Sequence, residues 1–255
     1  MSYLRSLLYM LILAITTPPL ALFIILCAPL PHRLRRRSAQ PWVFMTIWLI
    51  EHLLRIDYRV IGRENIPDKP VVILCKHQSA WETIVLQAIF PLVLFVWKKE
   101  LRWQLPFFGW ALAVIPMIAI DRGGGRQALK QLVDQGTLRL SQGYPIVIFP
   151  EGTRARPGTQ RAYQNGGAFL AIKAGVPVLP VALNSGEVWG RNALLKRPGT
   201  VTVSIGPAID PAGLKADKLT ARAEAWIEAE MKRISPHLYQ GHDENLARSP
   251  ADATA

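Results

Sequence analysis

The first candidate for chemistry is a histidine and a glutamate in the segment VVILCKHQSAWET, which covers residues 71–83. Its apolar start is typical of a buried strand, and an apolar helix is predicted from Trp81 onward. On one continuous helix His77 and Glu82 would point about 140° apart, so contact requires the predicted turn between strand and helix. If the side chains meet, the carboxylate fixes the imidazole tautomer, and the other ring nitrogen can take a proton from a substrate hydroxyl.

The same residues also fit a purely structural role. Residues 79–82, SAWE, have the pattern of a capping box, in which Glu82 reaches back to the backbone amide of Ser79. In that case the carboxylate only caps a helix, and His77 is an ordinary polar residue at a strand end. This segment alone leaves catalysis and capping open.

Two further polar turns follow predicted strands. In IVIFPEGTR (residues 146–154), the turn offers a flexible glycine, a hydroxyl and a guanidinium, which together can hold a phosphate. A solvated turn without a ligand is the alternative. In MIAIDRGGGR (residues 117–126), Asp121 and Arg122 precede three glycines, which can bring helix amides close to an anion. The segment matches no nucleotide-binding motif, so it gives little support for nucleotide binding.

Short apolar strands alternate with helical patterns beyond Asp57. The predicted strands cover residues 58–62, 71–75, 92–97, 117–120, 146–149, 176–183 and 200–205. This alternation predicts an α/β fold with a mostly parallel central sheet that is covered by helices on both faces. Ligand sites in such folds lie beyond the carboxyl ends of the strands, which is where His77 stands.

Three parts of the chain are predicted from these patterns. The clearest helices cover residues 126–141, 163–174 and 219–234, and Gly175 is a typical residue for ending the second. We predict a membrane anchor and interfacial helix at residues 1–56, one α/β domain at residues 57–235, and a disordered tail at residues 236–255.

The N-terminal part predicts membrane association. Residues 7–31 are almost wholly apolar and carry no charge, and this length exceeds the roughly 20 residues that cross a hydrocarbon core. Pro18 and Pro19 interrupt the run, so either one kinked helix spans the membrane or two short helices enter one leaflet. The lack of a small-x-small cleavage pattern argues against a cleaved signal peptide.

A basic cluster and a second apolar helix follow this anchor. HRLRRR at residues 32–37 fits the positive-inside preference and predicts that the α/β domain lies on the cytoplasmic side of the membrane. Residues 41–56 are too few to span, and they are predicted as an interfacial or core-packed helix. Trp42 and Trp48 favour the interfacial alternative, because tryptophan is enriched at membrane boundaries.

Composition narrows the classes of function. The chain has 255 residues, enough for one substantial core, and a formal net charge of +12, which favours an anionic partner. Cys27 and Cys75 are too few for a disulfide framework. The five histidines match no metal-binding motif, and no G-x-S-x-G elbow surrounds a serine, which argues against metal and serine hydrolases.

Four segments resemble, in this order and spacing, the four motif blocks of the 1-acylglycerol-3-phosphate acyltransferase family of glycerophospholipid synthesis. They are KHQSAWET, IDR, FPEGTR and VPVLPVALN. The resemblance extends from residue 71 to residue 184, and the N-terminal apolar anchor is also similar to that family. The joint occurrence of His-x4-Asp/Glu and EGTR is a more specific signal than either block alone.

The resemblance implies roles for individual residues. His77 is expected to be the general base that acts on a glycerol hydroxyl, with Glu82 orienting it. The substrate phosphate is expected to bind Arg122, Glu151, Gly152, Thr153 and Arg154. The chain departs from the family pattern at Glu82, where aspartate is common, and at Gln164 and Asn165, where many relatives carry a lysine. The fourth block is expected to lie along the path of the acyl chain.

The implied reaction transfers a fatty acyl group from an acyl thioester to the sn-2 hydroxyl of lysophosphatidic acid, giving phosphatidic acid. We expect no cofactor or metal, acyl-CoA or acyl carrier protein as the co-substrate, contact with membrane lipids, and no nucleic-acid partner. Two alternatives stay open. The acceptor can be another lysolipid, such as lyso-ornithine lipid or a lysophosphoglyceride, or the protein can be a membrane-tethered anion binder without catalysis.

Overall fold

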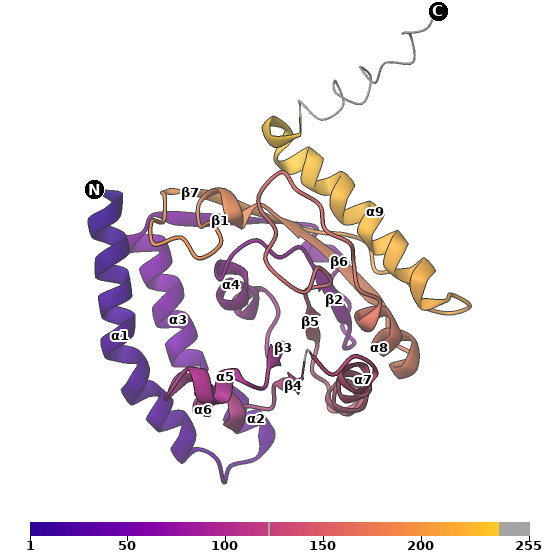
Figure 1. Cartoon of the computed structure of the whole chain (residues 1–255), viewed down its shortest axis with the longest axis horizontal. Helices are drawn as coiled ribbons and strands as arrows, with labels where there is room; N and C mark the ends of the chain where they lie inside the picture. Colours follow the sequence, from indigo (N-terminus) through magenta and orange to yellow (C-terminus); the bar gives the residue numbers. More distant parts are fainter. Residues whose placement is uncertain (122, 240–255) are drawn as a thin grey trace, which may run out of the picture.

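The structure is a computed structural model, and it describes residues 1–121 and 123–239 (Figure 1). Its centre is a seven-stranded sheet with the strand order β1-β7-β6-β2-β5-β3-β4. The strands are β1 (Ile56–Ile61), β2 (Val72–Cys75), β3 (Leu94–Lys98), β4 (Ile118–Ile120), β5 (Ile146–Ile148), β6 (Val178–Leu183) and β7 (Gly199–Ile205). Neighbouring strands are parallel except β6 and β7, which are antiparallel. The predicted mostly parallel α/β sheet is therefore confirmed.

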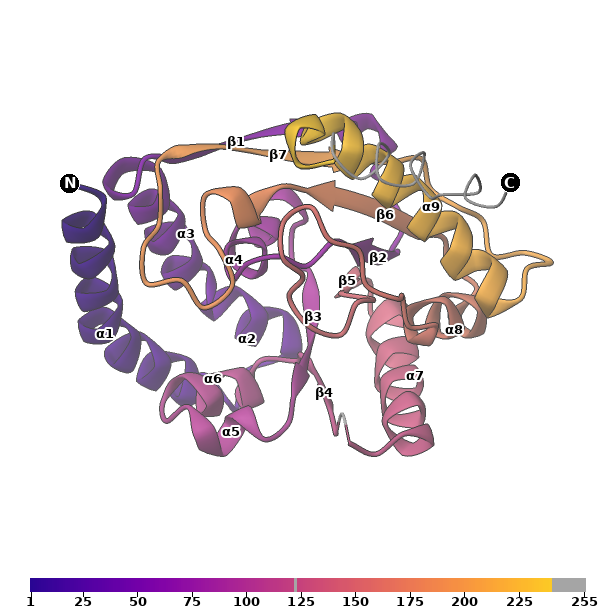
Figure 2. The same ribbon diagram turned by 45° about the horizontal axis from the view of Figure 1, so that its top comes forward.

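Helices cover both faces of this sheet (Figure 2). They are α1 (Ser2–Leu26), α2 (His32–Ser38), α3 (Gln40–Trp48), α4 (Trp81–Ile89), α5 (Leu101–Gln104), α6 (Phe108–Val114), α7 (Arg126–Ser141), α8 (Gly166–Ala174) and α9 (Ala216–Ile234). A π-helical turn, Leu49–Leu53, extends α3, and 3-10 turns lie at Arg63–Asn65, Ser185–Glu187 and Pro236–Leu238.

Strand β2 shows why these strands are continuously apolar. Successive side chains of a strand point to opposite faces of the sheet. Ile73 and Cys75 belong to the core on the side of α3 and α4, whereas Val72 and Leu74 belong to the core on the side of α7, α8 and α9. All four residues are fully buried, because helices cover both faces.

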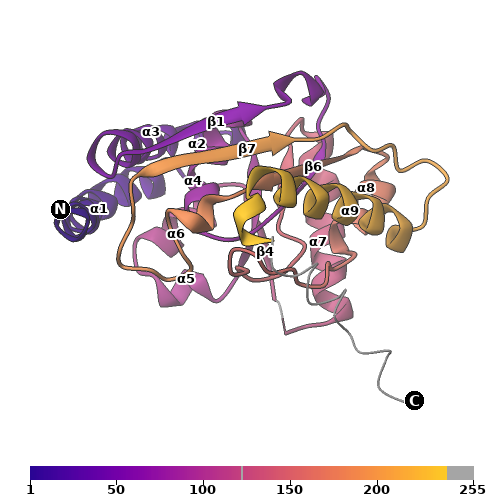
Figure 3. The ribbon, with the colours of Figure 1, turned by 90° about the horizontal axis from the view of Figure 1, so that it is seen from above.

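The N-terminal apolar run forms one continuous helix through Pro18 and Pro19, not two short helices. Helix α1 lies along the side of the domain in every view (Figures 1 to 3). Its buried side chains are Ser6, Tyr9, Ala21 and Ile24. The Tyr9 ring meets Trp189 edge to face at 5.5 Å between ring centroids. One face of α1 is thus attached to the domain, and the rest of the helix is mostly exposed apolar surface.

The segments after α1 differ in detail from their predictions. The predicted helix at residues 41–56 ends at Leu53, since β1 already begins at Ile56. Val43 on this helix is buried in the core, as a core-packed helix requires, whereas Trp48 is 57% exposed. The basic cluster is helical, and Arg36 is buried, with its guanidinium donating to the carbonyl oxygen of Val93. Parts of residues 1–56 therefore pack into the core of the domain, while most of α1 stays exposed.

The C-terminal end of the described chain reaches beyond the predicted boundary of the tail. The predicted helix at residues 219–234 is α9, which begins at Ala216. Residues 236–239 were predicted as part of a disordered tail, but Pro236–Leu238 forms a 3-10 turn, and the nearby Ser235 is fully buried. The remainder of the predicted tail, residues 240–255, lies outside the described residues.

Candidate active site

Three loops meet at one edge of the sheet, beyond the carboxyl ends of β6, β2 and β5. These strands are neighbours and run parallel. His77 lies two residues after β2, Glu151 three residues after β5, and Ser185 two residues after β6. Parallel strands place their carboxyl ends together, so residues far apart in the sequence reach the same place.

The His77 imidazole and the Glu82 carboxylate are in direct contact. Nδ1 of His77 lies 2.9 Å from Oε1 of Glu82. The same oxygen accepts hydrogen bonds from the amides of Gln78 and Ser79, both at 2.7 Å. The hydroxyl of Ser185 donates to the other oxygen, Oε2, at 2.8 Å. Glu82 is fully buried, and these contacts fix both oxygens of its carboxylate.

This geometry unites the two roles predicted for Glu82. Glu82 accepts from the amide of Ser79, as in one half of a capping box, but the hydroxyl of Ser79 accepts from the amide of Trp81 at 3.0 Å, and the N-cap residue of α4 is Ala80. The bonds from the amides of Gln78 and Ser79 hold the carboxylate where it meets the imidazole. With Nδ1 donating to Glu82, Nε2 is the ring nitrogen that can take a proton.

The ring and the backbone of His77 are also held by the FPEGTR segment. The imidazole stacks on the Phe149 ring, with 3.9 Å between centroids and 15° between planes. The amide of His77 donates to Oε2 of Glu151 at 2.9 Å, and its carbonyl accepts from the amide of Ala155 at 2.7 Å. The His77 side chain is 13% exposed, so it is positioned firmly but reaches the surface of a cleft.

A buried charge cluster lies behind this loop. The Lys76 ammonium, which is fully buried, contacts Oε1 of Glu151 at 2.9 Å and Oε1 of Glu228 at 2.8 Å. The Tyr163 hydroxyl donates to the same Glu228 oxygen at 2.9 Å. Burial raises the pKa of the Glu151 carboxyl, and the Lys76 ammonium opposes this effect. Since Glu228 lies on α9, the cluster ties α9 to the His77 loop.

Glu151, which is expected to bind the substrate phosphate, does not line the cleft. Its carboxylate points into the protein toward Lys76 and the His77 amide, not toward a substrate. Only 6% of the residue is exposed, and a carboxylate would repel a phosphate. Glu151 thus contacts the backbone of His77 and the Lys76 ammonium. Cys75 is also unsuited to act as a nucleophile, because burial raises the pKa of its thiol well above the ordinary value.

The other residues of the EGTR turn face the cleft or shape the turn. Gly152 has a φ of +68°, a conformation that favours glycine. Thr153 and Arg154 line the cleft. The Arg154 guanidinium donates to Oδ1 of Asn192 at 3.2 Å, and Arg191 donates to the carbonyl of Arg154 at 3.4 Å. Arg191 also lines the cleft, so two guanidinium groups lie on one side of it.

The second motif block is described only in part. Arg122 lies outside the described residues. Its neighbour Asp121 pairs with Lys99 at 2.9 Å, and the Lys99 ammonium lowers the pKa of the Asp121 carboxyl. Gln164 and Asn165, where many relatives carry a lysine, are exposed and do not line the cleft.

The cleft has a volume of about 620 Å³ and a polar and an apolar end. His77, Thr153, Arg154, Arg191 and Asn192 lie at the polar end. The apolar end is formed by side chains of α1, α3, β3, α5 and α6, including Ala21, Ile24, Val43, Phe95, Leu101, Phe108 and Ala111. An amphipathic ligand with a short polar part and an apolar tail matches this division.

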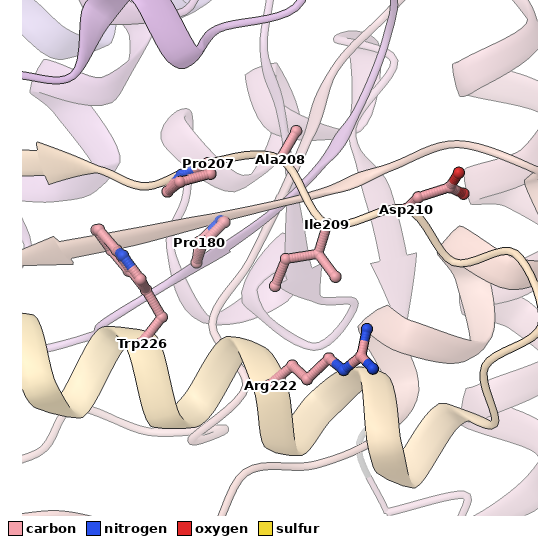
Figure 4. A pocket seen from close by; sticks show the side chains of 7 residues that line it. All are labelled: Pro180, Pro207, Ala208, Ile209, Asp210, Arg222 and Trp226. Carbon is pink, nitrogen blue, oxygen red and sulfur yellow. The ribbon is translucent and has the colours of Figure 1, made fainter.

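A second cavity of about 400 Å³ lies between β6, the segment after β7, and α9, and contains none of these residues (Figure 4). It is lined by Pro180, Pro207, Ala208, Ile209, Asp210, Arg222 and Trp226. Within the described residues, no group of three or more His, Cys, Asp or Glu side chains could hold a metal ion. The first cleft is therefore the candidate active site.

Several residues of this site carry no local signal in the sequence. Ser185 bonds to Glu82 across 103 positions, and Lys76 bonds to Glu228 across 152 positions. Arg191 lies in an irregular stretch after β6. The predicted parallel sheet gives a partial signal for Ser185, because it follows the strand next to β2.

Comparison with known proteins agrees with this geometry. The sequence matches the acyltransferase family model over residues 57–184. A 1-acyl-sn-glycerol-3-phosphate acyltransferase of Pseudomonas aeruginosa is 47% identical over 211 residues, which cover 81% of this chain and 82% of that protein. A protein of Chlamydomonas reinhardtii with the same enzyme name is 34% identical over 187 residues, covering 70% of this chain and 53% of that protein.

The fold is also found in a solved structure. The crystal structure of the 1-acyl-sn-glycerophosphate (LPA) acyltransferase PlsC from Thermotoga maritima superposes with a TM-score of 0.76. The match covers 92% of this chain and 96% of that chain at 23% identity, a likeness that concerns the fold alone. From the family match and the Pseudomonas aeruginosa relative it follows that this chain belongs to the acyltransferase family.

Proposed function

We propose that this protein transfers a fatty acyl group from an acyl thioester to the free sn-2 hydroxyl of lysophosphatidic acid, giving phosphatidic acid. The family and the names of its relatives support this reaction. The observation that carries the proposal is the His77–Glu82 pair, which opens into the same cleft as Arg154 and an apolar pocket.

His77 acts as a general base in this proposal. Nε2 takes the proton of the glycerol hydroxyl while its oxygen attacks the thioester carbonyl carbon. The tetrahedral intermediate collapses, the carbon–sulfur bond breaks, and the thiolate takes the proton from the imidazolium. Glu82 holds the tautomer and lies beside the developing positive charge. General base catalysis typically contributes about 10²- to 10⁴-fold, and the remainder comes from positioning and charge stabilisation.

The phosphate of the acceptor binds at the guanidinium groups of Arg154 and Arg191. Arginine presents donors in a fork that matches phosphate oxygens. The Thr153 hydroxyl lies along the same cleft and can add a further hydrogen bond. Arg122 stays a predicted phosphate ligand from its motif block. No cofactor takes part in this reaction.

The apolar end of the cleft receives a fatty acyl chain. Its walls are aliphatic and aromatic side chains, which favour burial of hydrocarbon by about 0.8 kcal/mol per CH₂ group. Acyl-CoA and acyl carrier protein are both compatible donors, because both present the same thioester. Only its carbonyl group, and not the carrier, has to reach the acceptor hydroxyl beside His77.

The protein associates with membranes through α1. This helix is long and apolar enough to cross a membrane, and its exposed face carries Leu4, Leu7, Leu11 and Ile15. Its opposite face is packed against the domain, which favours a helix embedded along one leaflet over a separate span. The exposed Arg33 and Arg37 then lie near anionic headgroups, and we place the catalytic domain on the cytoplasmic side.

A panel of acceptors tests the proposed reaction. Purified full-length protein in lipid is incubated with lysophosphatidic acid, lyso-ornithine lipid and lysophosphoglycerides with larger headgroups, each with acyl-CoA or acyl carrier protein. Thiol release and the acylated product are measured. The proposal predicts the highest kcat/KM for lysophosphatidic acid. If another lysolipid gives the highest kcat/KM, that lysolipid is the acceptor. Anion binding without thiol release would contradict acyltransferase activity.

A further inference from the structure

The segment between β3 and β4 presents large apolar side chains to the outside. Trp103 is 74% exposed, Leu105 and Phe107 are each 43% exposed, and Trp110 is 41% exposed. These four residues, named here the α5–α6 patch, lie within eight positions of the chain. Clustered exposed apolar side chains usually mark a surface that contacts a partner or a membrane.

The same segment forms a wall of the candidate active site. Leu101, Leu105, Phe108 and Ala111 line the cleft that contains His77. The other three patch residues, Trp103, Phe107 and Trp110, do not line it. Helices α5 and α6 thus separate the apolar end of the cleft from the exterior with a thin layer of apolar side chains.

The patch continues from the apolar helix α1. Ala111 and Ile115, on and just after α6, share a buried cluster with Ala21 and Ile24 of α1. Figures 1 and 2 show α5 and α6 beside the C-terminal half of α1. On this half of α1, Leu22, Phe23 and Leu26 are about half or more exposed. Apolar surface therefore extends over two neighbouring elements.

Charge around the patch identifies the occupant. Lys98 and Arg102 are exposed just before it, Lys99 is paired with Asp121, and the Arg102 guanidinium lies 5.2 Å from the centroid of the Trp103 ring. Tryptophan prefers the boundary between hydrocarbon and water, and basic side chains there are attracted to anionic headgroups. Aromatic residues flanked by basic residues, beside an apolar helix, match an anionic bilayer.

We propose that the α5–α6 patch inserts into an anionic bilayer beside α1, and that lysolipid passes from the bilayer into the cleft along this segment. The proposed entry of lysolipid rests on the proposed function, whereas the proposed contact with the bilayer does not. A single embedded surface then joins α1 to the cleft wall, so an acyl chain moves from bilayer to pocket without exposure to water.

Lipid contact is measured on the full-length protein with Trp103→Cys carrying a fluorophore. The native thiols, Cys27 and Cys75, are buried, so labelling is selective. Arg222→Cys on α9, distant from α5 and α6 in Figure 1, is the matched control. In phosphatidylcholine vesicles that contain phosphatidylglycerol, nitroxides on the lipid tails should quench the label at position 103 and not the label at position 222. Equal quenching at both positions, or shielding from aqueous iodide without lipid quenching, overturns the proposal.

Turnover tests the passage of substrate. Trp103→Asp should lower kcat/KM for long-chain lysophosphatidic acid in vesicles about tenfold, which corresponds to about 1.4 kcal/mol. A monomeric short-chain acceptor should be acylated at the wild-type rate, and Trp103→Tyr should retain activity on vesicles. If the Trp103→Asp protein acylates vesicle-bound lysophosphatidic acid at the wild-type rate, the proposed entry of lysolipid along this segment is wrong. If the wild type acylates neither acceptor, the proposed function fails, and the quenching result still decides the membrane contact.

Discussion

We expect the charge of Glu82 to contribute to catalysis separately from the hydrogen bonds that its carboxylate accepts from the backbone. In Glu82→Gln, the amide oxygen can keep the bonds from His77 and from the amides of Gln78 and Ser79, and the amide nitrogen can donate to the Ser185 hydroxyl. The substitution preserves the shape and the tautomer but removes the negative charge beside the imidazolium.

The distance between the two side chains sets the expected loss. A pair of unit charges at the observed 2.9 Å attracts by about 6 kcal/mol at an effective dielectric constant of about 20. If the proton is about half transferred in the transition state, roughly 3 kcal/mol is lost, which corresponds to about 10²-fold in kcat. KM should change little, because neither oxygen of Glu82 contacts a substrate.

Thiol release from acyl-CoA at saturating lysophosphatidic acid measures this effect. Glu224→Gln on α9 is the matched control, since Glu224 makes only an exposed hydrogen bond to Gln160 in the described structure. Thermal unfolding shows whether Glu82→Gln remains folded. A folded Glu82→Gln protein with kcat within a few fold of the wild type would refute the proposed role of the charge.

Three further predictions concern the surroundings of the pair. Arg154→Ala and Arg191→Ala should each raise KM for lysophosphatidic acid and have less effect on a lyso acceptor without a phosphate, as shown by steady-state kinetics. Lys76→Met should lower the free energy of unfolding by about 3–5 kcal/mol in a urea titration, because it leaves two buried carboxylates unpaired. Gly152→Ala should lower it by about 1 kcal/mol, because alanine is strained at positive φ.

A specific result would contradict each of these three predictions. Equal losses for acceptors with and without a phosphate would mean that the arginines shape the loop and do not bind phosphate. A Lys76→Met protein as stable as the wild type would show that the buried cluster does not anchor α9 to the His77 loop. Unchanged stability of Gly152→Ala would show that the turn adopts a different backbone conformation.

Local sequence patterns predict most of the strands and helices of the fold. Each predicted strand has a counterpart, because short apolar runs bounded by polar or glycine-containing turns describe buried strands well. The predicted helix at residues 126–141 coincides with α7, and Gly175 ends α8 in the left-handed conformation. The antiparallel direction of β7 was not predicted, since an apolar run carries no information about strand direction.

The site was less accessible to sequence reasoning, because its contacts are long-range. The predicted turn allows His77 and Glu82 to meet, but the sequence alone leaves open whether they do; the structure shows the contact. The contact of Ser185 with Glu82 depends on strand order, which no local pattern encodes. Glu151 was assigned to the substrate phosphate from its motif, and only the position of Lys76 shows that its carboxylate faces inward.

Removal of the His77 imidazole tests the central claim most directly. His77→Ala is compared with the wild type for thiol release from acyl-CoA and for formation of phosphatidic acid, in lipid and at saturating lysophosphatidic acid. General base catalysis predicts a loss of kcat of at least about 10²-fold in a folded protein. A folded His77→Ala protein with wild-type turnover would contradict the assignment of the base and the proposed mechanism with it.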